Sequence, residues 1–454
     1  MMGDAKTKRS KTRSPPAHAS PWQDAPTDAL GVVLHHVNSL SDNGRIATVC
    51  RAWRRAVAQL HPPLPPPLPW LLLPDFNLSR LSPDGAAATG HSLHLPDGTI
   101  PECVGSSCDG RVVLLREQRC FAMNPLTGAT TSLPEFDLHR GPRKELPYVP
   151  ANSHGNSPFR VSLPRKVVIS SSAPDRGSAT CIMAGISGHG PSASYVPVIR
   201  NGLHLSPPHD EAKGPPDVDE TCYATLFLCR PGDATWSVTT DVRLGATSDI
   251  VFHDGRLYFF DWMPDRKLSP RVHALDVGED ASDGALKVTG IRRLPGPIFR
   301  GARNRSMRAR SSSVFFYLVE SRGRLMAVMR ECGERRTHAV TVLALDEARR
   351  SPYKWATVET LDGEVVFLGP TSSLSVPAAL YPGARGDRIY FAQEMCVDGC
   401  PSRKDCRYQH CEVFDMRTRV VEAVCLGTAP RPDCWCWCPT WFVPSQQTYP
   451  DTNS

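Results

Sequence analysis

The spacing of hydrophobic residues changes once along the 454-residue chain, from a helical period to a strand period. The helical part covers residues 22–60. A first apolar stripe falls at i, i+3, i+4 and i+7, the spacing of an amphipathic helix, and consists of Leu30, Val33, Leu34 and Val37. A second stripe keeps this period through Ile46, Val49, Cys50, Trp53, Val57 and Leu60. We therefore predict short helices here, with Pro26 in the first turn of the first one.

These helices are too few to form a stable domain alone. About forty residues bury too little apolar surface for independent folding. We therefore expect a partner surface, in this chain or in another one.

A proline-rich segment follows at residues 61–69. It has six prolines between positions 62 and 69 in the sequence HPPLPPPLPW, which excludes a helix and favours extended polyproline II. We interpret it as a stiff spacer. A ligand for a domain that binds PxxP motifs is the alternative.

From Trp70 onward the pattern is that of strands. Short β-branched and aromatic runs such as VVLL, DIVF and LYFF are separated by Gly, Pro, Asn and Asp. A unit of glycine turn, apolar strand, connection and second strand recurs, anchored at Gly110, Gly255, Gly323 and Gly386. The wide first gap contains a further unit with KVVIS and TLFLC. Repeated antiparallel units predict a β-propeller over residues 70–445, although the pattern does not fix the number of blades. The predicted fold class is mostly β with a small N-terminal α unit; a pair of β-sandwiches is the competing architecture.

The distribution of charge along the chain limits the kinds of molecule that it is expected to bind. The formal net charge is +6, and most of it comes from residues 1–20, a basic tail expected to be disordered. Its KTKRSKTR run is either a nuclear import signal or a solvated tail. The rest of the chain is nearly neutral, which argues against nucleic-acid binding. Without an apolar run of membrane length or a secretory signal we expect a protein of the nucleus or cytoplasm, ending in a polar tail at 446–454.

The sixteen cysteines are expected to be reduced in such a compartment. The run CVDGCPSRKDCRYQHC contains a zinc-like spacing, whose candidate ligands are Cys396, Cys400, Cys406 and His410. A cysteine-rich loop without metal explains the same residues, and we predict no cofactor.

Catalytic motifs are absent from the sequence. It has no G-x-S-x-G elbow, no H-E-x-x-H pair and no P-loop. We therefore predict a protein that is not an enzyme, although a propeller channel can assemble a catalytic site from dispersed residues.

Two family resemblances connect these parts. Residues 22–60 resemble an F-box, whose pattern ends in Val-Cys-Arg-x-Trp-Arg. The chain keeps Val49, Cys50, Arg51, Trp53 and Arg54, but has Ala25 where the family has leucine before Pro26. Residues 70–445 resemble the KIB-type β-propeller that follows the F-box in many plant proteins, through WLLLP, CVGSSCDGRVVLL, CFAMNPLTGATTSLP and WFVPS.

The resemblances imply a substrate-recognition subunit of a Skp–cullin–F-box ubiquitin ligase. The helices would dock the Skp-type adaptor, and through it a cullin, while the propeller would bind an unknown target protein. The residues that the resemblance assigns to adaptor contact are Pro26, Leu30, Val33, Leu34, Val37 and Trp53, backed by Val49 and Cys50. These residues also have a purely structural interpretation, in which they pack the helices together. The alternative function is a propeller scaffold or cryptic enzyme that acts outside a ligase.

Overall fold

The fold was obtained as a computed structural model. It describes residues 26–36, 46, 49–58, 68–73, 76–81, 87–93, 95, 101–107, 110–116, 119–135, 166–170, 183–188, 224–230, 233–244, 247–261, 271–298, 312–333, 336–346, 353–381, 383–392, 408–428 and 439–444. The predicted tails at 1–20 and 446–454 and most of the predicted spacer lie outside these residues. The chain divides into two compact units, Met1–Leu64 and Pro65–Ser454, at a point within the proline-rich segment.

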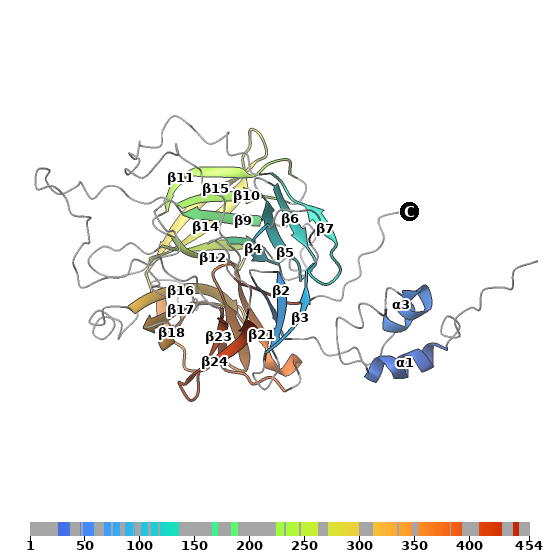
Figure 1. The fold of residues 1–454 in the computed structure, drawn as a ribbon. Coiled ribbons are helices and arrows are strands. Elements are labelled where there is room, and N and C mark those ends of the chain that lie inside the picture. The colour runs from blue at the N-terminus through green and yellow to red at the C-terminus, as the bar shows by residue number, and fades with distance from the viewer. Residues whose placement is uncertain are drawn as a thin grey trace, which may run out of the picture. The chain divides into compact units, whose positions relative to one another are not determined.

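The first unit contains two described helices that pack on each other, α1 (Thr27–His36) and α3 (Arg51–Ala58) (Figure 1). Helix α1 begins directly after Pro26, whose carbonyl accepts a hydrogen bond from the Leu30 amide at 3.1 Å. Asp28 lies in its first turn, where a carboxylate complements the positive end of the helix dipole. Neither described helix is long and apolar enough to cross a membrane.

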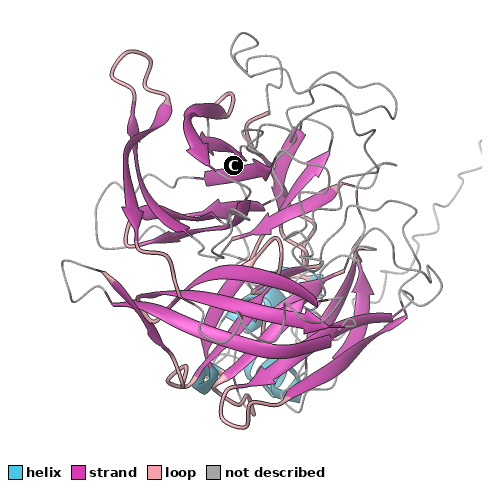
Figure 2. Ribbon diagram, turned by 90° about the vertical axis from the view of Figure 1, so that its left-hand side faces the viewer, coloured by secondary structure: helices cyan, strands magenta, loops and turns pink. Residues whose placement is uncertain are grey.

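The second unit is built almost entirely of antiparallel strands (Figures 1 and 2). The first four-stranded sheet has the order β25-β1-β2-β3 and consists of β25 (Thr440–Phe442), β1 (Trp70–Leu72), β2 (Asn77–Leu81) and β3 (Ala87–Ser92). An eight-stranded sheet combines two runs of four strands. The first run is β4 (Glu102–Ser106), β5 (Val112–Arg116), β6 (Arg119–Met123) and β7 (Thr130–Ser132); the second is β8 (Lys166–Ile169), β9 (Met183–Gly188), β10 (Ala224–Cys229) and β11 (Ser237–Leu244).

Three further sheets complete the unit. One consists of β12 (Thr247–His253), β13 (Arg256–Asp261), β14 (Arg271–Glu279) and β15 (Leu286–Leu294). The next consists of β16 (Ser312–Ser321), β17 (Arg324–Gly333), β18 (Arg336–Asp346) and β19 (Lys354–Thr357). The last has the order β21-β20-β22-β23-β24 and consists of β20 (Glu364–Leu368), β21 (Ser373–Pro377), β22 (Arg388–Ala392), β23 (Tyr408–Asp415) and β24 (Val421–Thr428), with the short 3-10 helix η2 (Ala378–Leu380) after β21.

The innermost strands of these sheets form a closed ring. Contacts run from β25 to β4, β8, β12, β16 and β21, and from β21 back to β25. The buried apolar residues form a separate cluster between each pair of neighbouring runs of strands around the ring. This arrangement confirms the predicted β-propeller and excludes the pair of sandwiches. By hydrogen bonding it has five blades, one of which is the double, eight-stranded sheet.

Gly105 explains why two runs of strands share one sheet. It pairs in parallel with Val167, so that β4 and β8 are joined at the axis. A Cβ atom at Gly105 would stand 2.2 Å from the Val167 carbonyl oxygen, a backbone atom that cannot move aside. Only glycine permits so close an approach of the two backbones.

The propeller closes by pairing the two ends of its chain segment. Strand β1 pairs with β25 in the register Trp70↔Phe442 and Leu71↔Trp441. The WLLLP and WFVPS segments of the family resemblance are therefore neighbours, and all the side chains of this pair of strands are buried.

Two of the predicted glycine turns are tight hairpins. Asp254 and Gly255 have φ values of 44° and 73° between β12 and β13, and Arg322 and Gly323 have 51° and 68° between β16 and β17. Positive φ at both central residues is the type I′ geometry that suits twisted strands. At Gly386 the expectation was wrong: the positive φ belongs to the next residue, and Gly386 instead packs against the backbone of Gly363.

Candidate functional site

The helical unit exposes apolar side chains. Leu30 of α1 is fully buried, whereas Val32 of the same helix is 60% exposed. Val49, just before α3, is 67% exposed. The exposed valines leave apolar surface that a partner protein can cover.

The residues predicted to contact an adaptor occupy different environments. Pro26 is exposed, and Val33, Cys50 and Trp53 are half-buried. The side chain of Leu34 and the whole of Val37 lie outside the described part of the chain. Helix α1 packs on α3, and Leu30 of α1 is buried.

The candidate zinc ligands are mostly outside the described residues. Cys396, Cys400 and Cys406 are not described, and His410 lies on β23. Its neighbour Cys411 is fully buried, and burial raises the pKa of its thiol far above the usual range. Within the described ranges no three His, Cys, Asp or Glu side chains are arranged to hold a metal.

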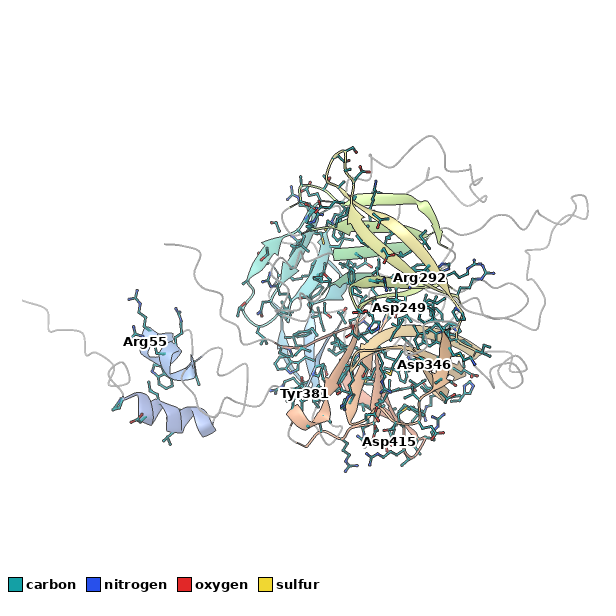
Figure 3. The ribbon with its side chains drawn as sticks, turned by 180° about the vertical axis from the view of Figure 1, so that it is seen from behind. Arg55, Asp249, Arg292, Asp346, Tyr381 and Asp415 are labelled. Carbon is teal, nitrogen blue, oxygen red and sulfur yellow. The ribbon has the colours of Figure 1, made fainter. Side chains whose placement is uncertain are left out.

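An ion pair lies at the propeller axis, buried among four inner strands. Lys166 of β8 and Asp249 of β12 are 4% and 3% exposed, and their Nζ and Oδ1 atoms are 2.5 Å apart. Lys166 also donates to Ser373 Oγ of β21 at 3.1 Å. Asp249 accepts the backbone amides of Ile250 and Leu318, each at 2.8 Å. We call this group the axial clasp; its Asp249 is labelled in Figure 3.

The charged groups of the axial clasp are hydrogen-bonded to one another and to neighbouring protein groups. Burial is the largest influence on Asp249 and raises its pKa, although Lys166 and the two amides act in the opposite direction. A buried charge pair is tolerated only where further hydrogen bonds satisfy both partners, and here protein groups supply them. The geometry suits a structural tie between strands better than a site for substrate.

A second buried cluster joins the last two sheets of the ring. Arg330 of β17 donates to Glu412 Oε2 of β23 and to Thr337 Oγ1, both at 2.7 Å. The Thr337 hydroxyl in turn donates to Glu412. The guanidinium also stacks over the ring of Phe391, 4.7 Å from its centroid. These contacts tie β17, β18 and β23 together.

Asp387 is the third polar hub, between the same two sheets. The side chain is 2% exposed and accepts hydrogen bonds from Arg417 Nε, Thr360 Oγ1 and the Leu361 amide. Burial acts to raise its pKa, but these donors outweigh burial and hold the pKa below the usual range.

Sequence reasoning missed the axial clasp. Lys166 begins β8 and Asp249 is the third residue of β12; the sequence showed them only as the first letters of two apolar runs, KVVIS and DIVF. A single charged residue at the start of each apolar run was the available signal. Its partner could not be found, since 83 positions separate the two residues.

A family model decides the relationship. The model of the KIB1-4 beta-propeller matches residues 80–415, well over half of the chain. The chain belongs to the KIB1-4 beta-propeller family. The family match covers the strands from β3 to β23 and leaves the helical unit outside; it includes the first two polar clusters and Asp387, but not Arg417.

Other comparisons add little to the family assignment. No curated protein matches the sequence. Among solved structures, Bacteroides ovatus xyloglucan PUL GH43B is 11% identical, with a TM-score of 0.27 and 75% of this chain and 53% of that chain covered. Cobalt-substituted Synechocystis ACO is 12% identical (TM-score 0.27, 78% and 65% covered), as is a puromycin-hydrolysing peptidase of Mycobacterium tuberculosis (TM-score 0.25, 81% and 55% covered). The chain thus spans between half and two thirds of each of these proteins, and TM-scores of this size carry no argument.

Proposed function

We propose that this KIB1-4 propeller protein is the substrate-recognition subunit of a Skp–cullin–F-box ubiquitin ligase. In this proposal residues 22–60 dock the Skp-type adaptor, which brings the cullin, and the propeller binds the target protein. The support from the sequence is the order of an F-box-like segment, a proline-rich segment and a KIB-type propeller.

The observation that carries the proposal is the exposure of Val32 and Val49. Among the described residues of the helical unit Leu30 is buried, whereas Val32 and Val49 are exposed and offer apolar surface. Burying such surface against a partner is favourable, at about 25 cal/mol per Å² of apolar area. An adaptor helix or loop is the kind of partner that covers such a small surface.

The subunit itself is proposed to be non-catalytic. The polar clusters described in the propeller are hydrogen-bonded within the protein, as expected for structural groups. Ubiquitin transfer would then follow from proximity, since the ligase holds a target lysine near the charged ubiquitin carrier. We propose the nucleus or the cytoplasm as its location, and no cofactor.

Capture of a purified Skp-type adaptor by the full-length chain tests the proposal. Val49→Asp places a charge on exposed apolar surface and is expected to weaken capture by at least about tenfold, because the interface would bury an unpaired carboxylate. Val420→Asp is the matched control, since Val420 is 49% exposed on the propeller. It should leave capture unchanged.

The outcomes separate the two functions under consideration. If the unmodified chain does not capture the adaptor, the ligase proposal is wrong and the scaffold alternative takes its place. If Val49→Asp and Val420→Asp weaken capture equally, the adaptor does not bind through the helical unit.

A further inference from the structure

We propose that the outer edge of β15 binds an acidic, extended segment of a partner protein by strand addition. Strand β15 is the last strand of its sheet and, at nine residues, the longest of the described outer strands. Within the described residues only β14 pairs with it. A long edge strand leaves one row of backbone amides and carbonyls free to pair with an incoming strand.

Apolar side chains are exposed along this edge. Ile291, within β15, is 52% exposed, and Ile298, just beyond it, is 69% exposed. Ile291 pairs across the sheet with Leu275, which is fully buried. The apolar surface therefore continues outward from the core to the edge strand, where an added strand can cover Ile291.

The charge of this edge selects an acidic partner. The ionisable residues of β15 are Lys287, Arg292 and Arg293, all cationic. Asp280 neutralises Lys287 at 2.7 Å, whereas Arg292 donates to the neutral Tyr353 hydroxyl, at 3.3 Å. Among the described residues no carboxylate forms an ion pair with Arg292 or Arg293. Opposite charges on cross-strand neighbours stabilise strand pairing, so acidic side chains opposite these arginines would be favoured.

Cationic edges also protect sheets against aggregation, which is the competing explanation. Protection, however, gives no reason for two isoleucines to be half exposed or more at the same edge. The combination of free backbone, apolar surface and unneutralised arginines fits a binding edge better. The suggestion that this edge is the target-binding surface of a ligase subunit rests on the proposed function. The affinity of the edge for a peptide can nevertheless be measured without any adaptor.

Fluorescence anisotropy with the full-length chain tests the proposal. The probe is a short labelled peptide of alternating glutamate and valine, which should bind saturably. The same peptide with every backbone amide N-methylated keeps its charge but has no N–H on either edge to pair with β15, and should bind at least about tenfold more weakly. Arg293→Glu should weaken binding of the first peptide about tenfold or more. Arg336→Glu, an equal charge change at an exposed site on β18, should alter it by less than about twofold.

Each contrary result overturns a stated part of the proposal. Absence of saturable binding refutes the site, and equal binding of the N-methylated peptide refutes strand addition. Equal losses in Arg293→Glu and Arg336→Glu would mean nonspecific attraction to a basic surface. Adaptor capture is measured separately, so a chain that captures adaptor but not this peptide would retain the ligase function and lose only this edge.

Discussion

Replacing Asp249 by alanine removes the acceptor at the centre of the axial clasp. Lys166 would then be buried without its counter-ion, and the amides of Ile250 and Leu318 would each lose an acceptor. Breaking a buried ion pair from one side costs about 3–5 kcal/mol, and an unsatisfied buried amide about 1–3 kcal/mol. These costs overlap, because the site relaxes and admits water, and we expect a loss of about 5 kcal/mol.

Replacing Lys166 by methionine should cost less. Asp249 would keep both amide donors and can bind a proton, so we expect a loss of about 2 kcal/mol. The second unit has about 390 residues. At about 2.1 cal/mol/K per residue its unfolding entropy is roughly 0.8 kcal/mol/K, so Asp249→Ala should lower the Tm by about 6 °C and Lys166→Met by about 2–3 °C.

The effect of pH provides an internal check. Burial raises the pKa of Asp249 and Lys166 lowers it, so removal of Lys166 raises this pKa further. A carboxyl group whose folded pKa exceeds its unfolded value stabilises the fold at low pH, and that stabilisation is lost as the pH rises through the folded pKa. The Tm deficit of Lys166→Met relative to the unmodified chain should therefore shrink between pH 7 and pH 5.

Thermal unfolding followed by the β-sheet circular dichroism signal measures these differences. A Tm change below about 1 °C for Asp249→Ala, or a larger loss in Lys166→Met than in Asp249→Ala, would refute the reasoning.

Three further predictions concern other parts of the propeller. Asp387→Asn should destabilise the fold by about 1–3 kcal/mol at neutral pH. This loss of stability should disappear as the pH falls through the lowered folded pKa of Asp387. Urea unfolding at several pH values measures it. Burial raises the pKa of Cys103 to about 11, so iodoacetamide at pH 8 should label the half-buried Cys50 well before Cys103. Peptide mass spectrometry measures the two labelling rates, and equal rates would contradict the burial of Cys103. Gly105→Ala should lower the Tm by several degrees, because its Cβ would collide with the Val167 carbonyl; an unchanged Tm would show that β4 and β8 separate freely.

Local turn chemistry made part of the fold predictable. Asp254-Gly255 indicated a hairpin because two consecutive residues with positive φ favour this pair, and the structure has that hairpin. KVVIS and TLFLC indicated a further unit in the widest gap, where β8 and β10 lie. The local sequence pattern did not explain Gly386, because the contact that requires glycine there is with a residue distant in the sequence. Gly386 lies against the backbone of Gly363 and is not required by a turn.

The propeller's interior chemistry was not predictable for the same reason. Lys166 and Asp249 meet only because two inner strands converge at the axis, and no spacing rule connects residues so far apart. Three of the four glycine anchors, Gly110, Gly255 and Gly323, precede the second strand of a run. These glycine anchors therefore did not mark the inner strands β8 and β12, which carry Lys166 and Asp249. In the helical unit the period placed both Leu30 and Val49 in its apolar stripes, although Leu30 is buried and Val49 is exposed.

The pairing of β1 with β25 has a consequence for synthesis on the ribosome. Strand β1 is translated before every other described strand, yet its inner neighbour β25, with Trp441 and Phe442, is translated after all of them. Until Thr440–Phe442 emerges, the nascent ring keeps one gap, and β1 presents an unpaired apolar edge that is open to chaperones or to aggregation. The ring can therefore close only in a chain that includes β25, because any chain terminated before Thr440 retains the open edge of β1. Such products should be recognised as unfolded even though every other blade strand is present.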